Sequence, residues 1–224
     1  MNKDYVKVIY NEKDRPLTQY PSRLARHLFN RYKLIPGNKM LEVGYGRGEF
    51  LQGFIDCGME GYGVDQCHST DNCCPGAQLK VSNIEEDGIP FDDGMFDVVY
   101  SKSVIEHFHY PDKMMREVYR VLKPGGMVIT LCPSWEFNYR IYFEDYTHRT
   151  PFMLSSLRDI LRIHGFENIG VEYFRQLPVL WGAGACLLPL TELTRLLVPR
   201  QLGRYSKWVR FSKEIMLLSC ATKP

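Results

Sequence analysis

Residues 39–48 read Lys-Met-Leu-Glu-Val-Gly-Tyr-Gly-Arg-Gly, a short apolar run followed by glycine at every second position. The run predicts a buried strand, and the glycines predict a tight turn that opens a helix from Glu49 to Cys57. Such a turn brings backbone N–H groups and a helix N-terminus close to a ligand. A dinucleotide-binding loop needs the pattern G-x-G-x-x-G, with glycine at position 49, where this chain has Glu49.

Apolar segments alternate with helical ones along the rest of the chain. Further strands are expected at 61–65, 77–81, 96–100, 127–132, 169–174 and 214–222, and further helices at 21–34, 112–122 and 152–164. Uniformly apolar strands separated by helices predict a mostly parallel sheet that is covered on both faces. The sequence therefore predicts an α/β fold, a doubly wound seven-stranded sheet with an antiparallel C-terminal strand pair.

The chain reads as one domain, because it contains no internal repeat and no linker-like segment. We expect an N-terminal helical cap over 1–38, a ligand-binding core over 39–132, and acceptor-side insertions with the C-terminal strands over 133–224. The composition, 45% hydrophobic and 24% charged in 224 residues, is that of an ordinary globular protein.

Charge is distributed unevenly over the chain. The net charge is +2, yet from Arg195 to the end there are seven Lys or Arg against the single acid Glu214, so the preceding part has 21 bases and 25 acids. This indicates either a solvated basic face or a surface for an anionic partner. No aromatic and basic platform accompanies it, so no nucleic-acid partner is expected.

Seven scattered cysteines and an N-terminus without an apolar leader favour the reducing cytoplasm. The charge-free run 176–191 has 16 residues, fewer than the roughly 20 that a membrane span needs. Segment 176–210 is therefore expected either to cover the binding site as a lid or to lie on the inner face of the membrane. The oligomeric state is left open.

Asp65 ends the second expected strand, seventeen residues after Gly48. A carboxylate at this place can accept hydrogen bonds from the two hydroxyls of a ribose. The loop and Asp65 are followed, in order, by Asn83-Ile84-Glu85, Phe96-Asp97-Val98-Val99, Val104-Ile105-Glu106-His107 and Arg120-Val121-Leu122-Lys123-Pro124-Gly125-Gly126. Together these segments resemble the class I S-adenosylmethionine-dependent methyltransferases, in the small-molecule branch with a Rossmann-like fold.

The resemblance implies S-adenosylmethionine as cofactor and S-adenosylhomocysteine as product. It places the glycine loop against the methionine end of the cofactor and Asp65 on its ribose, with Asn83 in a position that is usually Asp and faces adenine. The implied cofactor-binding residues are Glu42, Gly44, Tyr45, Gly46, Gly48, Asp65, Gln66, Asn83, Ile84, Glu85, Ser101, Lys102 and His107.

Residues 144–152 resemble the Asp-x-Thr-His element of bacterial glycan and lipopolysaccharide methyltransferases. We interpret His148 as the general base for a hydroxyl acceptor, with Asp145 orienting it and with Tyr146 and Arg149 near the acceptor. The alternative is that Asp145 caps a turn and His148 closes a lid over the cofactor. The expected acceptor is a small molecule or a glycan.

Two other functions stay open at this point: C- or N-methylation of a quinone-like or amine metabolite, and a non-catalytic cofactor-binding partner protein. Cys67, His68, Cys73 and Cys74 offer soft metal ligands at close spacing, but adjacent cysteines rarely both bind a metal and the spacing matches no known zinc motif. No metal ion is expected.

Overall fold

The computed structural model describes residues 16–67 and 74–224, and its described strands form one seven-stranded sheet of order β3-β2-β1-β4-β5-β7-β6. The strands are β1 (Lys39–Val43), β2 (Glu60–Asp65), β3 (Gln78–Val81), β4 (Phe96–Lys102), β5 (Leu122–Pro133), β6 (Glu167–Phe174) and β7 (Met216–Thr222). Neighbours from β3 to β5 pair in parallel, whereas β7 is antiparallel to both β5 and β6. The predicted doubly wound sheet with an antiparallel C-terminal pair is confirmed.

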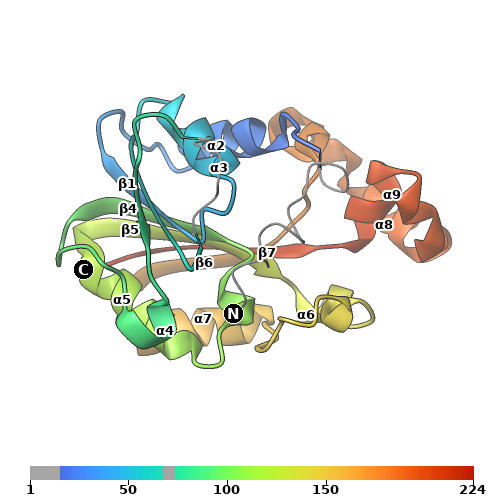
Figure 1. Cartoon of the computed structure of the whole chain (residues 1–224). Coiled ribbons are helices and arrows are strands. Elements are labelled where there is room, and N and C mark those ends of the chain that lie inside the picture. The colour runs from blue at the N-terminus through green and yellow to red at the C-terminus, as the bar shows by residue number, and fades with distance from the viewer. Residues whose placement is uncertain (1–15, 68–73) are drawn as a thin grey trace.

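Helices cover both faces of the sheet, with α2 and α3 on one face and α4, α5 and α7 on the other (Figure 1). The α-helices are α2 (Tyr20–Arg31), α3 (Glu49–Ile55), α4 (Ile84–Asp87), α5 (Pro111–Val121), α6 (Trp135–Asn138), α7 (Leu154–Ile163), α8 (Leu188–Leu197) and α9 (Lys207–Lys213). The 3-10 helices are η1 (Ile105–His107), η2 (Tyr142–Glu144), η3 (Pro178–Leu180), η4 (Gly182–Leu187) and η5 (Arg200–Arg204).

Alternation of side chains along the strands divides the core into two clusters. On β1, Met40 packs with the α2 and α3 face, whereas Leu41 and Val43 pack with the α5 and α7 face. Helix α5 buries Met114 and Val118 against that second face. The sheet is therefore held from both sides, and its carboxyl edge is fixed in space.

Several expected boundaries differ from those observed by a few residues, and two of these differences have a clear physical reason. The Lys123–Gly126 stretch, which lies between the expected helix 112–122 and the expected strand 127–132, is part of β5. The pairing of β5 with β4 shifts register between Phe96 and Val98. Gly125 has a φ of +77°, which suits this irregularity. Helix α3 ends at Ile55 rather than at Cys57, because the chain then turns through Gly58, whose N–H donates to the Ile55 carbonyl.

Helices α8 and α9 stand beyond one end of the sheet, on the right of Figure 1. Helix α8 buries Thr191 and Thr194 but exposes leucines along its length. The exposed fractions of Leu193, Leu196 and Leu197 are 52%, 68% and 72%. Among the described residues, no helix combines the length and the apolar character that crossing a membrane requires.

Candidate functional site

A cavity opens at the carboxyl ends of β1 and β2, beside the start of η1. Its lining residues are Val43, Gly44, Gly46, Val64, Asp65, Gln66, Cys67, Ser82, Ile84, Glu85, Ser103, Val104, His107 and Phe108. The strand order reverses between β1 and β4, and doubly wound sheets bind ligands at such a reversal. The topology therefore puts the glycine loop 44–48 at the edge of the sheet where a ligand is expected to bind.

The loop conformation requires glycine. Gly44, Gly46 and Gly48 have φ values of +74°, +51° and +76°, in the left-handed region that other residues rarely adopt. A Cβ atom built on Gly44 would lie 2.4 Å from Cγ2 of Val104. The backbone at Gly44 thus packs directly against Val104, the residue before η1, and it borders the cavity.

The carboxylate of Asp65 is hydrogen-bonded to this loop at the edge of the cavity. Its Oδ2 accepts a hydrogen bond from the Gly46 N–H at 2.9 Å, and its Oδ1 accepts one from the Cys67 N–H at 3.2 Å. Burial raises the pKa of Asp65, although these backbone N–H groups oppose the shift. The structure therefore brings together the two features that the sequence singled out, the glycine loop and the strand-terminal acid.

The expected cofactor-binding residues divide into two groups. Gly44, Gly46, Asp65, Gln66, Ile84, Glu85 and His107 line the cavity, whereas Glu42, Tyr45, Gly48, Asn83, Ser101 and Lys102 are not among its lining residues. The side-chain carbonyl of Asn83 accepts a hydrogen bond from the Glu85 N–H. It therefore caps α4 and is not free to bind a ligand. Ser101 is buried, and its hydroxyl donates to Thr130 at 3.3 Å.

Sequence reasoning missed the other lining residues, Val43, Val64, Cys67, Ser82, Ser103, Val104 and Phe108. Most of them directly neighbour residues that were selected, because side chains next to a strand end all reach the same edge. Ser103 carries a further signal, since it is a non-glycine residue with a φ of +56° immediately after β4.

Segment 142–150 is fastened to η1 by hydrogen bonds. The N–H groups of Arg149 and Thr150 both donate to the Glu106 carbonyl, at 2.8 and 3.1 Å, and the Thr150 hydroxyl donates to the Phe108 carbonyl at 2.9 Å. The Tyr142 hydroxyl donates to the Thr150 carbonyl at 2.7 Å. These bonds hold the predicted Asp-x-Thr-His element beside the cavity.

Hydrogen bonds also determine the tautomers of two neighbouring histidines. The Thr147 hydroxyl donates to Oδ1 of Asp145 at 2.5 Å, so Nδ1 of His107, 2.8 Å from the same hydroxyl oxygen, must be the donor. Nδ1 of His148 lies 2.6 Å from the carbonyl oxygen of Tyr142, which can only accept. In the neutral form of either ring, the unshared pair is therefore on Nε2.

The hydrogen bonds of the Asp145 side chain go to Thr147, and Asp145 meets His148 through its backbone, since the His148 N–H donates to the Asp145 carbonyl at 3.2 Å. Oδ1 of Asp145 accepts from the N–H and the hydroxyl of Thr147, and Thr147 in turn contacts His107. Burial opposes ionisation of Asp145, but these two hydrogen bonds and the nearby histidines hold its pKa below the usual value. The backbone carbonyl of Tyr142 orients the His148 ring.

The two expected acceptor contacts lie on the outer side of this segment. Tyr146 is 69% exposed. Arg149 is also exposed, and its guanidinium donates to the Tyr146 carbonyl at 2.7 Å. Neither side chain is among the lining residues of the cavity.

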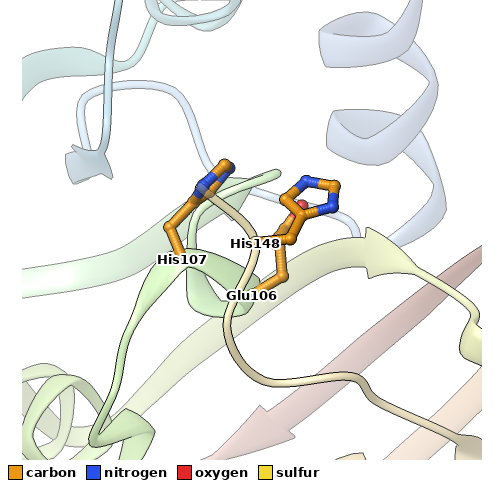
Figure 2. Close-up of side chains that lie close together, drawn as sticks. All are labelled: Glu106, His107 and His148. Atoms are coloured by element: carbon orange, nitrogen blue, oxygen red, sulfur yellow. The ribbon is translucent and has the colours of Figure 1, made fainter. Parts of the chain in front are cut away.

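Glu106 is a buried acid for which the sequence predicted no role. It is 0% exposed, and neither carboxylate oxygen has a hydrogen-bond partner in the described part of the chain. Burial raises its pKa to about 8. Burial and the neighbouring His148 lower the pKa of His107 to about 4. Figure 2 shows Glu106, His107 and His148 gathered in one place.

The cysteine cluster near Asp65 is only partly described. His68 and Cys73 lie outside the described residues. Cys67 lines the cavity, and the thiol of Cys74 donates to the Gly48 carbonyl at 2.9 Å.

Comparison with known proteins gives one family match and many relatives. The model of the family described as "Methyltransferase domain" matches residues 41–130. An uncharacterized methyltransferase of Mycobacterium sp. (strain KMS) is 35% identical over 101 residues, which are 44% of this chain and 40% of that protein. The match thus covers less than half the length of this curated relative.

Solved structures share the fold at low sequence identity. A chain from the complex of the Haloferax volcanii Trm112 methyltransferase activator with a methyltransferase superimposes with a TM-score of 0.72 at 18% identity, covering 100% of this chain and 99% of that one. Phosphoethanolamine N-methyltransferase 2 of Haemonchus contortus, in complex with phosphomonomethylethanolamine and S-adenosylhomocysteine, gives 0.63 at 21% identity, covering 90% of this chain and 53% of that one.

Proposed function

We propose a reaction and an acceptor class for this protein on the premise that residues 41–130 are a class I S-adenosylmethionine-dependent methyltransferase domain. The proposed reaction is transfer of a methyl group to a hydroxyl oxygen of a small molecule or a glycan. The observation that carries it is the pair His107 and His148, whose rings lie 4.8 Å apart beside the cavity and each hold an unshared pair on Nε2.

S-adenosylmethionine fits the residues at the cavity. Gly44 and Gly46 present bare backbone to the cavity, and Asp65 presents a carboxylate suited to the ribose hydroxyls. Glu42 is buried at the end of β1, and its Oε2 has no partner within residues 16–67 and 74–224. The cofactor supplies a methyl group already activated on a positively charged sulfur, and S-adenosylhomocysteine is the product.

The protein's task is then to orient the acceptor and to receive its proton. Bound in the cavity, the cofactor would give its methyl group to the acceptor oxygen, and the electron pair of the broken carbon–sulfur bond would stay on sulfur. Nε2 of His148 accepts the hydroxyl proton, because the Tyr142 carbonyl keeps the other ring nitrogen protonated. The Asp145 carboxylate acts on His107 through Thr147.

The test is the variant His148→Ala with labelled cofactor and a cell extract as the source of acceptor. We expect methyl transfer to fall by about 100-fold or more while the affinity for S-adenosylhomocysteine stays unchanged. Neither His148 nor His109 lines the cavity, but His148 lies beside His107, which does. His109→Ala is the matched control, because His109 is exposed and lies outside the cluster of Glu106, His107 and His148. Unchanged turnover in His148→Ala with normal cofactor binding would show that His148 only closes the site.

A second candidate function is N-methylation of an amine. It is supported by the similarity to phosphoethanolamine N-methyltransferases. A neutral amine already carries its unshared pair, so it needs a base less than a hydroxyl does. Mass spectrometry of an extract incubated with labelled cofactor separates the two, because it identifies the product and the atom that carries the label. A product that carries the labelled methyl group on nitrogen would indicate N-methylation.

A third candidate is a cofactor-binding partner of another protein, since one structural neighbour comes from a complex with a methyltransferase activator. The labelled-methyl assay decides this as well. Binding of S-adenosylhomocysteine without transfer to any component of the extract would indicate a binding partner rather than an enzyme.

We further propose that α8 and its flanking residues dock on the inner face of an anionic membrane. The leucines of α8 face outward, and the adjoining segment carries a basic groove. The groove is lined by Glu144, Arg200, Gly203, Arg204, Tyr205, Ser206, Lys207, Arg210, Lys213 and Glu214. An apolar face beside an excess of positive charge suits a bilayer surface with anionic headgroups.

Flotation with vesicles tests this surface. We expect the protein to float with vesicles that contain phosphatidylserine and to remain behind with vesicles of phosphatidylcholine alone. High salt should weaken the association, because the electrostatic part is screened. If no vesicle retains the protein, segment 176–210 is a cover for the domain and not a membrane surface.

A further inference from the structure

We propose that Glu106, His107 and His148 form a binding site for one divalent transition-metal cation beside the cofactor cavity. One possible ligand atom from each residue lies within 4.8 Å of the other two. Figure 2 shows the three side chains together, two of them from η1 and one from segment 142–150. Neither the family match nor the sequence analysis assigns a metal here; the sequence expectation was that no metal binds.

Glu106 supplies the first argument, because a buried carboxylate needs compensation. Both of its oxygens lack hydrogen-bond partners in the described structure, and the residue is completely buried. A carboxylate left in this condition is costly unless it is paired, protonated or bound to a metal. A cation between Glu106 and the two imidazoles would satisfy it directly.

The histidines supply the second argument. Metal-binding histidines usually donate their other ring N–H to a carbonyl, a carboxylate or another acceptor, which fixes the tautomer and the ring orientation. Here Nδ1 of His148 donates to the Tyr142 carbonyl, and Nδ1 of His107 donates to Thr147, which is itself bonded to Asp145. Both rings are thus held in the tautomer that presents Nε2 to a metal.

Backbone hydrogen bonds fix the distance between the two parts of the site. The N–H groups of Arg149 and Thr150 both donate to the carbonyl of Glu106, so the residue after His148 is bonded to the same residue that provides the carboxylate. These bonds keep the backbones of the two parts side by side, so that only the side chains need to move when a cation binds.

The donor set indicates the class of cation. Two imidazole nitrogens and one carboxylate oxygen suit zinc and its neighbours in the first transition row better than magnesium or calcium, which prefer oxygen. Ligand atoms about 2.1 Å from zinc in a tetrahedral site lie about 3.4 Å apart. The present limit of 4.8 Å therefore requires a closure of about 1.4 Å, which side-chain rotation can provide.

Three protein ligands leave a coordination position open, as in catalytic zinc sites. His107 also lines the cofactor cavity, so an acceptor in that cavity lies next to the cation. This role rests on the proposed function and changes one detail of it. His148 would then bind the cation, and the cation would lower the pKa of the acceptor hydroxyl in its place, releasing the proton to water.

The experiment measures metal binding separately from methyl transfer. Untagged protein is stripped with a chelator, and Zn²⁺ or Mn²⁺ is then titrated by equilibrium dialysis with elemental analysis. We expect one equivalent of Zn²⁺ per chain. The variants His107→Ala, His148→Ala and Glu106→Gln should each weaken binding by about 100-fold or more. Circular dichroism and binding of S-adenosylhomocysteine verify that each variant is folded.

Two control variants should keep the full affinity for Zn²⁺. His109→Ala removes an exposed histidine close to the site, and Cys67→Ser with Cys74→Ser removes the nearby thiols. If the cysteine variant loses the metal while His148→Ala keeps it, the proposed site is wrong. It is equally wrong if folded wild-type protein binds no Zn²⁺ or Mn²⁺.

The failure of this proposal can be distinguished from failure of the proposed function. Metal-free protein that transfers methyl groups at the full rate would overturn the role of the cation in the reaction and leave the methyltransferase activity established. Protein that binds one Zn²⁺ at these residues but transfers no methyl group would keep the site and remove the reaction.

Discussion

Gly44 combines two constraints on a single residue: a positive φ and contact with Val104. We expect Gly44→Ala to weaken binding of S-adenosylhomocysteine by about tenfold or more, because a left-handed alanine costs about 1–2 kcal/mol and its Cβ would be 2.4 Å from Val104. Isothermal titration calorimetry measures this affinity. Gly94→Ala is the control, since its φ is +62° but its Cβ would meet no atom within 4 Å. Equal affinity in both variants would contradict the argument.

Asp65 gives cofactor binding a pH dependence. Its folded pKa is raised by burial, and the ribose contact needs the ionised carboxylate, so affinity should fall with decreasing pH earlier than for an ordinary aspartate. Below the raised pKa, the affinity for S-adenosylhomocysteine should drop about tenfold per pH unit. Calorimetry between about pH 4 and pH 8 measures how the affinity for S-adenosylhomocysteine falls.

The variant Asp65→Asn separates this carboxylate from other titrating groups. Loss of hydrogen bonds to a charged group costs about 1.5–3 kcal/mol, so the variant should bind more weakly at neutral pH. Its affinity should also be nearly independent of pH in the acid range. A variant with the same pH profile as the wild-type protein would assign the titration to another group.

At the residue scale, the sequence predicted those site residues whose role depends on the backbone. Gly44, Gly46 and Asp65 follow from strand ends and turns, which are local features. The partners of Asp145 and Asn83 could not be predicted, because each has a nearby backbone N–H that competes for its side chain. Glu106 was missed because its burial depends on segment 142–150, far along the chain.

At the element scale, Arg120 and Glu117 join α5 to the loop before β4. The guanidinium of Arg120 donates to Ile89, Phe91, Asp93 and Glu117, and Glu117 also accepts from the Ile89 N–H at 2.7 Å. The arginine of the Arg-Val-Leu-Lys-Pro-Gly-Gly stretch therefore has a structural role. Its side chain holds the loop before β4 in place and does not line the cavity.

This connection predicts a pH-dependent contribution to stability. The bond from Arg120 lowers the pKa of Glu117, although burial opposes the shift, so its contribution is present above the unfolded pKa near 4.5 and is lost as pH falls through the folded value. Near pH 7, Glu117→Gln should reduce the free energy of unfolding by about 1–3 kcal/mol. Urea denaturation should show the difference from wild type shrinking below about pH 4.5.

The exposed Asp92 provides the control for this measurement. Asp92→Asn should change the free energy of unfolding by no more than about 0.5 kcal/mol at any pH in the range. The loss of unfolding free energy in Glu117→Gln could instead stay constant down to pH 3, about one unit below the pKa of an ordinary carboxyl group. The side chain would then contribute through its shape and not through its charge.

The elements of the core were predictable because their apolar periods are local. Strands β1 and β2 begin and end within one residue of the expected positions. The β5 irregularity was not predictable, since Lys123–Gly126 has the composition of a turn and only pairing with β4 and the contacts of Lys223 make it part of the strand. Helix α8 packs through Thr191 and Thr194 and exposes its leucines, which the apolar composition of segment 176–210 does not predict.

At the scale of the whole molecule, the chain separates into a sheet with its cavity and an outlying helical unit of α8 and α9 (Figure 1). Arg195 joins the unit to α6, since its guanidinium lies 5.4 Å from the centre of the Phe137 ring. The exposed leucines lie outside both core clusters. Membrane docking and cofactor binding should therefore be separable by mutation.

The triple variant Leu193→Ser, Leu196→Ser and Leu197→Ser tests this separation. Their side chains are more than half exposed, so each change should alter the free energy of unfolding by about 0.5 kcal/mol or less. Flotation with anionic vesicles should fall by about tenfold or more, because each leucine loses apolar burial in the bilayer. Ile163→Ser, at the end of α7 and 74% exposed, should leave flotation unchanged. If the triple variant floats normally, the basic groove alone binds the vesicle; if it loses the affinity for S-adenosylhomocysteine, the helical unit supports the cavity and the two activities are not separable.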